Sequence, residues 1–259
     1  MSTQLATVPP LGAQWPAGPV HRSIVAVDLE GSTKRTNPVK GELRRVLYEL
    51  LDRALAEAGF AARHLERLTD RGDGVLILIR PHDDLPKTVL LSRLIPILTA
   101  LLVRYNAAVA WPTLQMRLRA VVHAGEVHDD GNGFYGEDLD VAFRLLDSPS
   151  VKRALREAPG SPLVLVVSEE IFSVVVRQGY VDERSYQRCV HVRVAERRRR
   201  GRVQVPGAPH GGRPVTALEP KARSASPLAV APVDGPPGRV VAVSFPSVSG
   251  HARPRPRRG

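Results

Sequence analysis

The sequence predicts an α+β fold, a ferredoxin-like sandwich with the element order β-α-β-β-α-β. Short β-branched apolar runs are separated by long segments with helical apolar spacing. Two of the predicted strands follow each other as a hairpin, without a helix between them. Mixing hairpins with helical connections favours an α+β sandwich over a strictly alternating α/β fold.

The first half of the predicted domain contains three strands and one long helix. Residues 23–28 form a β-branched apolar run that ends in an acid, a pattern typical of a strand buried on both faces. Apolar residues recur at helical spacing from Val39 to Ala58, so we expect one long amphipathic helix there. Residues 62–68 and 74–79 are then expected to pair as a hairpin.

The second half of the domain begins with another long helix, from Lys87 to about Ala108, which Pro96 should strain or bend. The remaining elements follow from alternation, helical spacing or short apolar runs. They are a half-buried strand at 115–122, a helix at 138–146, a buried strand at 163–167 with Ser168 capping the next helix, and an edge hairpin of 190–194 with 202–205.

Charge and proline content set the domain boundaries within the 259 residues. Thirteen Lys and Arg but two acidic residues lie from Arg197 onward, so this segment carries the whole net charge of +11. Residues 208–259 hold 10 of the 23 prolines without sustained apolar periodicity, which predicts a disordered tail. We expect a disordered leader at 1–20 and the folded domain at 21–207. The tail is interpreted as solvated, with salt-sensitive contact to nucleic acid or anionic lipid as the alternative.

Cysteine usage and hydropathy bear on where the protein works. A single cysteine, Cys189, provides no disulfide framework, and no secretory leader is recognisable. The most apolar window, from Val89 to Val103, contains Arg93 and Pro96 and is shorter than the roughly 20 residues of a spanning helix. We therefore expect a cytoplasmic protein without a membrane span.

Two aspartates stand at the ends of neighbouring predicted strands. Asp28 closes the first strand, and Asp73 lies between two glycines at the hairpin tip. In a split β-α-β sandwich the first strand and the hairpin are neighbours, so both carboxylates should converge on one patch. After Asp28, Gly31 allows a close backbone approach, and the hydroxyls of Ser32 and Thr33 can cap a helix or face a phosphate.

Two interpretations of this pair remain open from the spacing alone. Convergent carboxylates beside glycines form a hard-oxygen site for Mg²⁺ or Mn²⁺, which bind through one or two acids plus phosphate oxygens. Aspartate is also common at strand ends and in turns without any ligand. His123, His128 and Glu126 lack further ligands at metal spacing, so we assign them core or surface roles.

Several motifs together resemble the class III nucleotidyl cyclase catalytic domain, bacterial type. They occur in the family's order between about residues 21 and 207. The motifs are Asp28-Leu29-Glu30-Gly31-Ser32-Thr33, Gly72-Asp73-Gly74, the segment from Arg117 to Val127, and Tyr135-Gly136 followed by Val141-Ala142-Phe143-Arg144-Leu145. The family's fold agrees with the sandwich inferred from the elements.

The resemblance implies a head-to-tail homodimer with active sites at its interface. Asp28 and Asp73 of one subunit would hold two Mg²⁺ or Mn²⁺ ions on a nucleoside triphosphate, with the Leu29 carbonyl as a further ligand. Arg144 of the other subunit would stabilise charge developing at the α-phosphate, because guanidinium groups meet phosphate oxygens in a fork. The expected products are a 3′,5′-cyclic nucleotide and pyrophosphate.

The sequence departs from the family's pattern at three positions. Thr69 stands where adenylyl cyclases carry a purine-reading lysine, and Gly133 stands where its partner residue would fall, so the base is unspecified. Asp140 replaces the asparagine that orients the ribose, and its charge near a triphosphate costs at least about 1 kcal/mol. These departures favour a second hypothesis, a catalytically degenerate domain that binds nucleotide or dimerises. The run Arg197–Arg200 lies near the family's triphosphate-binding lysine, but is interpreted as a solvated edge loop.

Overall fold

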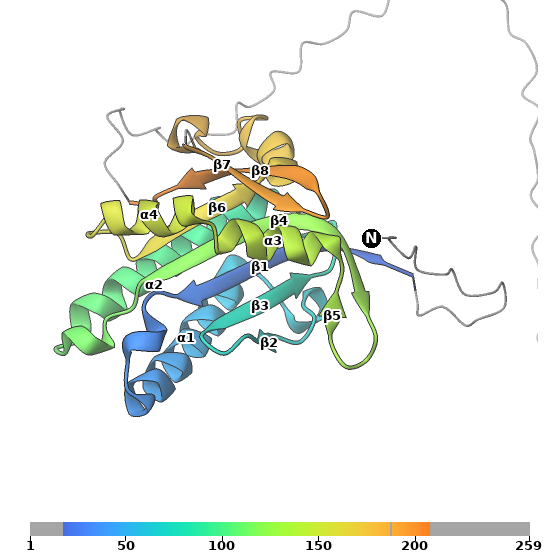
Figure 1. The fold of residues 1–259 in the computed structure, drawn as a ribbon. Coiled ribbons are helices and arrows are strands. Elements are labelled where there is room, and N and C mark those ends of the chain that lie inside the picture. The colour runs from blue at the N-terminus through green and yellow to red at the C-terminus, as the bar shows by residue number, and fades with distance from the viewer. Residues whose placement is uncertain (1–17, 187, 208–259) are drawn as a thin grey trace, which may run out of the picture. The chain divides into compact units, whose positions relative to one another are not determined.

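A computed structural model describes residues 18–186 and 188–207, which lie within one compact unit. An eight-stranded sheet carries helices on both faces (Figure 1), which confirms the predicted α+β class. The finer description as a ferredoxin-like sandwich stays a prediction. The proposed tail at 208–259 and residues 1–17 of the proposed leader lie outside the described residues.

The first strand lies inside the sheet, between β3 and β4. Seven strands follow the order β2-β3-β1-β4-β6-β8-β7, and β5 pairs with the end of β4. Only β4 and β6 run parallel among these neighbours. The strands are β1 (Val20–Leu29), β2 (Thr69–Asp70), β3 (Gly74–Ile79), β4 (Leu118–Asp129), β5 (Phe134–Tyr135), β6 (Leu163–Ser168), β7 (Arg188–Val194) and β8 (Arg197–Gln204).

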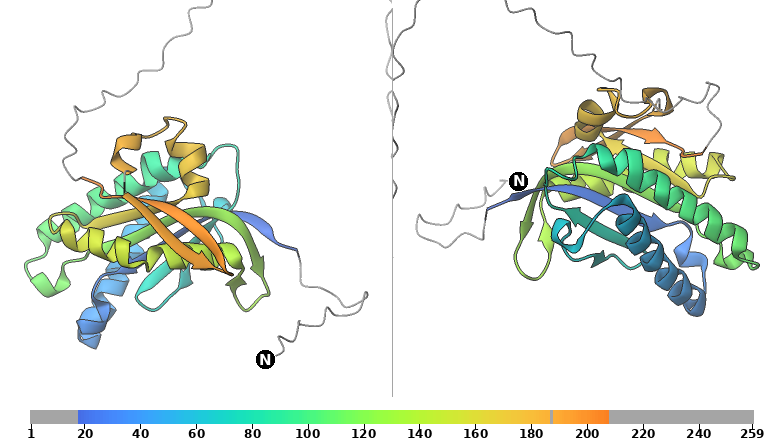
Figure 2. Two further views of the ribbon diagram at one scale, coloured as in Figure 1. Left: turned by 45° about the horizontal axis from the view of Figure 1, so that its top comes forward. Right: turned by 180° about the vertical axis from the view of Figure 1, so that it is seen from behind.

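Two pairs of helices cover opposite faces of this sheet. Helices α1 (Asn37–Ala58) and α2 (Ile95–Ala108) lie on one face, and α3 (Glu137–Leu146) and α4 (Pro149–Glu157) lie on the other (Figures 1 and 2). The short α5 (Glu169–Ile171) follows β6 and continues as a π-helical turn, Phe172–Val176. The helix predicted at 39–58 is therefore confirmed, and Gly59 ends it in the left-handed conformation.

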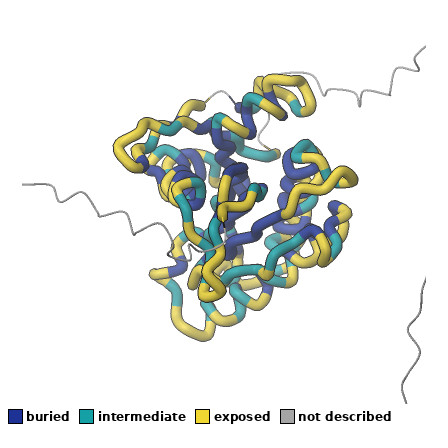
Figure 3. Tube along the Cα trace, turned by 90° about the vertical axis from the view of Figure 1, so that its right-hand side faces the viewer, coloured by how far each residue is buried: buried dark blue, intermediate teal, exposed yellow. Residues whose placement is uncertain are grey.

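Each face of the sheet has its own apolar core. Along β1, Val25 and Val27 pack toward α1 and α2, whereas Ile24 and Ala26 pack toward α3 and α4. This alternation follows from the two-residue period of a strand. The central strands are buried on both sides (Figure 3), as the apolar run at 23–28 predicted.

The strand predicted at 62–68 is largely wrong. Residues Ala62–His64 form a 3₁₀ turn, and β2 contains only Thr69 and Asp70. The buried His64 ring accepts a hydrogen bond from the Ala61 backbone amide at 3.0 Å, which holds the chain in the turn. Only an isolated bridge, between Leu65 and Ile79, connects the intervening segment to β3.

Other element boundaries differ from the predicted ones where a proline or tertiary packing determines where a helix or strand begins. A π-helical turn, Leu90–Leu94, precedes α2, as expected beside Pro96, which lacks a donor for the helical ladder. The strand predicted at 115–122 begins later and continues to Asp129, and β5 and α4 were not predicted. By length and composition alone the helix Leu90–Ala108 would suffice to cross a membrane, a test that core helices also pass. Its buried residues belong to the core shared with α1.

Candidate functional site

The β1–β3 ladder brings Asp28 and the Asp73 turn together. Asp28 lies opposite Gly74 in the antiparallel register, and the Leu29 amide donates a hydrogen bond to the Asp73 carbonyl at 3.0 Å. A Cβ on Gly74 would lie 2.4 Å from the Val27 carbonyl oxygen, so only glycine permits this approach. The predicted convergence of the two strand ends is therefore present in the backbone.

The Asp28 carboxylate has one satisfied and one unsatisfied oxygen. Arg119, opposite Asp28 on β4, donates a hydrogen bond to Oδ2, whereas Oδ1 is buried without a hydrogen-bond partner among the described residues. Burial is the largest influence on the pKa of Asp28 and raises it. Arg119 opposes that effect without cancelling it, and the negative charge of Asp73 adds to it. Asp28 thus has an oxygen available for a cation.

The loop after β1 supports Asp73. Gly31 adopts φ 68° at the start of a 3₁₀ turn, Ser32–Lys34. The buried Ser32 hydroxyl donates a hydrogen bond to Asp73 Oδ2, and no side-chain cap is formed at this turn. Of the two roles considered for Ser32, helix capping is therefore absent, and the side chain holds the second carboxylate. Thr33 is exposed beside it.

The residues present fit a divalent cation. Asp28 offers a buried oxygen that no other described residue bonds, and Asp73 supplies a second carboxylate from the adjoining turn. Across residues 18–186 and 188–207 no cluster of three or more His, Cys, Asp or Glu is placed to hold a metal. A cation here would complete its shell with backbone carbonyls, water or ligand oxygens, as Mg²⁺ sites on phosphates usually do.

Helix α3 carries Asp140 and Arg144 on one exposed side, four residues apart. Neither side chain has a hydrogen bond or ion pair with another described residue. The helix is joined to the Asp73 turn through Arg71, whose guanidinium lies 3.9 Å from the centre of the Phe143 ring. Arg71, Asp140 and Phe143 line a depression of about 660 Å³. Within the described part of one subunit, therefore, no contact connects Arg144 to Asp28 or Asp73.

The two predicted base-reading positions make few contacts. Thr69 lies in β2 opposite Leu76, and its hydroxyl donates a long hydrogen bond of 3.5 Å to the Arg67 carbonyl. Gly133 lies in the β4–β5 turn with open space where a side chain would be. Nothing at these two positions selects a purine.

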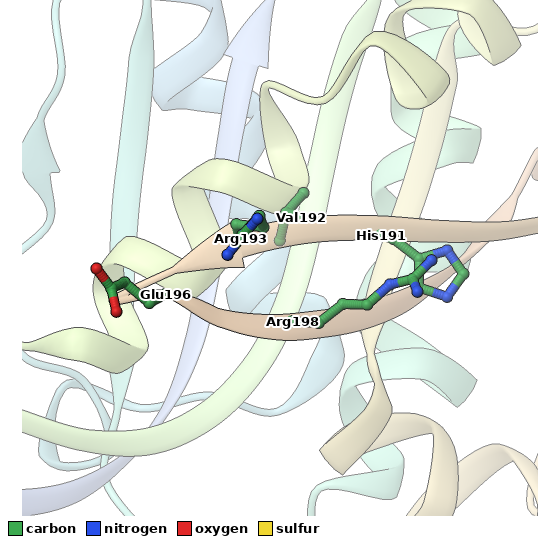
Figure 4. Close-up of a pocket in the computed structure, with 5 residues that line it drawn as sticks. All are labelled: His191, Val192, Arg193, Glu196 and Arg198. Atoms are coloured by element: carbon green, nitrogen blue, oxygen red, sulfur yellow. The ribbon is translucent and has the colours of Figure 1, made fainter.

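The arginine run at 197–200 forms part of β8, so the predicted loop is wrong, although Arg197, Arg198 and Arg200 are exposed as expected. Arg199 pairs with Glu137 on α3, and Arg200 pairs with Glu169 on α5 at 2.8 Å. Arg198 lies on the outer side of the β7–β8 hairpin with His191 and Arg193, along a depression of about 350 Å³ (Figure 4). Backbone pairing with β6 and β7 makes this run a strand, and acids on two helices neutralise part of its charge.

Two residues near the carboxylates were missed at the sequence level. Arg119 pairs with Asp28, and its side chain is only 12% exposed. Arg71 links the Asp73 turn to α3. The alternation of Arg117 and Arg119 with apolar residues in the predicted strand was the available signal, since it placed both arginines on one face.

The arrangement of sheet and helices is similar to that of solved nucleotidyl cyclases. The structure of the guanylyl cyclase Cya2 matches with a TM-score of 0.51 at 13% identity, covering 72% of this chain and 93% of that one. An adenylate/guanylate cyclase/hydrolase from Silicibacter pomeroyi matches with a TM-score of 0.54 at 20% identity, covering 74% and 100%. The domain has a class III nucleotidyl cyclase fold. No protein-family model and no curated protein sequence matches the chain.

This likeness establishes the fold alone. At 13% and 20% identity it does not extend to activity, because one fold hosts many functions. The chemistry of the domain therefore depends on its own residues. The candidate residues are the Asp28–Asp73 pair on the sheet and the exposed pair Asp140 and Arg144 on α3.

Proposed function

We propose that this domain is a class III-type nucleotidyl cyclase that converts a nucleoside triphosphate into a 3′,5′-cyclic nucleotide and pyrophosphate. The ribose 3′-oxygen loses its proton to solvent and bonds to the α-phosphorus. The bond from that phosphorus to the pyrophosphate oxygen breaks, so atoms and charge balance. The base is not specified, and adenine, guanine and the pyrimidines are all admissible.

The observation that carries the proposal is the buried, unpartnered Oδ1 of Asp28 beside the Asp73 turn, on a sheet of cyclase fold. A buried carboxylate oxygen without a donor is costly unless a cation or hydrogen bond satisfies it. Two acids contributed by adjoining strand ends are a suitable binding set for Mg²⁺ or Mn²⁺ bridging to phosphate oxygens. An aspartate that only ends a strand or forms a turn would have no need to bury a carboxylate oxygen.

The residues have separate roles in this proposal. Asp28 and Asp73 hold two divalent cations, with the Leu29 carbonyl as a further ligand on the same strand end. When bound, the cations neutralise phosphate charge and lower the pKa of the ribose hydroxyl. Ser32 orients Asp73 through its hydrogen bond, and Gly31 leaves space for the triphosphate beside the loop.

The proposed active form is a head-to-tail homodimer with a ferredoxin-like core in each subunit. Arg144 is exposed and has no ion pair among the described residues, as expected for a group that acts on a second subunit's substrate. Its guanidinium would stabilise the charge that develops on the α-phosphate and the leaving pyrophosphate. Asp140, on the same side of α3, would face the ribose.

A second candidate is a catalytically degenerate cyclase-like module that binds nucleotide or dimerises without turnover. Asp140 favours it, because a carboxylate beside a triphosphate opposes binding. Arg119 favours it as well, since its guanidinium already neutralises part of the Asp28 charge. The two candidates differ in whether any cyclic nucleotide is formed.

Purified full-length protein should therefore be incubated separately with ATP, GTP, CTP and UTP, in Mn²⁺ and in Mg²⁺, and products identified by mass spectrometry. We expect a cyclic nucleotide from at least one triphosphate. Its absence under every condition would contradict the enzyme and favour the degenerate module.

Matched variants test the assignment of the carboxylates. Asp73→Asn keeps the side-chain shape and should abolish product, whereas Asp83→Asn removes an exposed loop acid and should leave product unchanged. Persistent activity in Asp73→Asn would contradict the two-cation assignment. Mixing Asp73→Asn with Arg144→Ala subunits tests the homodimer, because one intact site per mixed dimer should restore activity.

A further inference from the structure

His123 is a buried histidine that contacts two helix N-termini. It lies in β4 and is 0% exposed. Its ring Nε2 is 3.3 Å from Asp138 Oδ1 in the first turn of α3. Its Nδ1 is 2.7 Å from the Ser168 hydroxyl and 3.4 Å from Glu170 Oε2, at the start of α5. Both ring nitrogens therefore face oxygen acceptors, which favours the doubly protonated imidazolium.

The acids around His123 favour the same protonation state. Burial is the largest influence on the pKa of His123 and lowers it, but the hydrogen bonds to Asp138 and Glu170 outweigh burial and leave it raised. The hydrogen bond from His123 in turn lowers the pKa of Asp138, and lowers that of Glu170 to about 2. His123 is thus a buried cation held between the carboxylates of Asp138 and Glu170.

Asp138 is fixed to β4 by both of its oxygens. Besides the contact with His123, its Oδ2 accepts a hydrogen bond from the Glu126 backbone amide at 2.6 Å. A Cβ on Gly125 would lie 2.1 Å from the same carboxylate, so the glycine leaves the space that Asp138 occupies. The start of α3, at Gly136, has no side-chain cap. Asp138 thus adds a polar attachment between the first turn of α3 and the sheet, beside the apolar packing of Leu139.

Asp140 and Arg144 lie on the same helix, two and six residues beyond Asp138. A helix moves as a rigid element over this length, so the position of its first turn sets the position of both side chains. We propose that His123 is a positioning residue: its imidazolium, held between Asp138 and Glu170, fixes α3 and thereby the placement of Arg144. This inference rests on the proposed cyclase function.

Protonation of His123 gives this attachment a dependence on pH. The other charged groups near it are already paired: Glu126 with His21, Glu137 with Arg199, and Glu169 with Arg200 and Arg177. Asp138 and Glu170 are the acids left facing the ring. As pH rises through the raised pKa of His123, Asp138 and Glu170 lose the charge of the imidazolium. The polar attachment of the first turn of α3 then weakens, while the Glu126 amide and the packing of Leu139 remain.

The test compares His123→Gln with His64→Gln in the full chain. Glutamine retains hydrogen bonding but cannot carry the charge. His64 is equally buried but contacts the backbone of its own turn, so it controls for the loss of a buried ring. We expect His123→Gln to lower kcat by about 100-fold, the scale of a misplacement near 1 Å, with KM little changed. We expect the kcat of the wild type to decline at alkaline pH, and this decline should be absent in His123→Gln.

Amide hydrogen exchange gives a readout that does not require turnover. Exchange of α3 in the wild type should accelerate at alkaline pH beyond the change shown by α1, and His123→Gln should exchange rapidly in α3 at all pH values. Asp138→Asn, which keeps the shape but not the charge, should behave in the same way. It provides a second variant if His123→Gln does not fold.

The outcomes separate this inference from the proposed function. A wild type without cyclase activity would contradict the proposed function, while α3 exchange would still test the attachment through His123. Equal α3 exchange in wild type, His123→Gln and Asp138→Asn would overturn the positioning role. So would unchanged kcat and pH profile in an active, folded His123→Gln.

Discussion

Arg119 on β4 faces Asp28 on β1, and their side chains form an ion pair. Asp28 Oδ1 stays buried, without a hydrogen-bond partner in the described part of the chain. The two side chains are only 12% and 18% exposed. Arg119 also lies 3.6 Å from Asp147, through its second terminal nitrogen. The candidate site therefore contains a cation of its own, positioned beside the oxygen that a metal would use.

The Arg119→Met variant should destabilise the protein and increase its response to Mn²⁺. Removing one partner of a mostly buried pair leaves the Asp28 charge uncompensated, at a cost of about 3 kcal/mol in the free energy of unfolding. A divalent cation can replace the missing charge, so Mn²⁺ should raise the melting temperature more than in wild type. Denaturant unfolding and thermal scans with and without Mn²⁺ measure both effects.

Arg117→Met is the matched control, because Arg117 pairs with Glu30 and with backbone carbonyls rather than with Asp28. It should also lose stability, but with a Mn²⁺ response like that of wild type. Equal responses in wild type and Arg119→Met would show that Asp28 does not take part in binding.

The Ser32→Ala variant should weaken divalent-cation binding. Ser32 donates a hydrogen bond to Asp73, and removal of a partner that orients a metal ligand typically costs about tenfold or more in affinity. Calorimetric titration of Mn²⁺ into the apo protein measures the change. Ser92→Ala removes a hydroxyl that bonds within its own helix and should leave affinity unchanged. A Ser32→Ala protein with wild-type affinity would contradict the orienting role.

The convergence of Asp28 and Asp73 was predictable because both ends belong to neighbouring strands of known order. A strand that ends in Asp28 and a hairpin tip at Asp73 leave little freedom once β1 and β3 are adjacent. The long helices were equally predictable, since apolar spacing over five turns specifies α1 almost by itself.

The contacts of Arg119 and His123 were not predictable from local pattern. Arg119 meets Asp28 across 91 residues, and this pairing depends on the exact register of β1 against β4. His123 was assigned a core or surface role because its partners, Asp138 and Glu170, come from two other elements. The strand at the arginine run was missed for the same reason, since β8 forms by pairing with β6 and β7.

The free energy of unfolding should be greatest at intermediate pH, because His123, Asp138 and Glu170 lose their mutual stabilisation at both acidic and alkaline pH. The pKa of His123 is raised in the folded state, so its contribution is complete below the ordinary histidine pKa and is lost as pH rises through the folded value. The pKa values of Asp138 and Glu170 are lowered, so their contributions exist above ordinary carboxyl values and are lost as pH falls. Denaturant midpoints across the pH range measure the curve.

His123→Gln should flatten the alkaline side of that curve. The acidic side should shrink too, because the variant no longer holds the carboxyl pKa values down. An alkaline decline of unchanged size in His123→Gln would assign the effect to another group.

The Asp140→Asn variant should increase turnover if α3 faces the substrate as proposed. The carboxylate opposes a triphosphate by about 1 kcal/mol, so its removal should raise kcat/KM by about fivefold for whichever nucleotide is used. Asp52→Asn removes an equal charge from an exposed position on α1, on the other face of the sheet, and should change nothing. Steady-state kinetics on wild type, Asp140→Asn and Asp52→Asn measure this change in kcat/KM. If the wild type proves inactive and Asp140→Asn gains product, then that single carboxylate accounts for the degenerate behaviour. If neither forms product while Mn²⁺ still binds through Asp73, the carboxylate pair serves nucleotide binding alone.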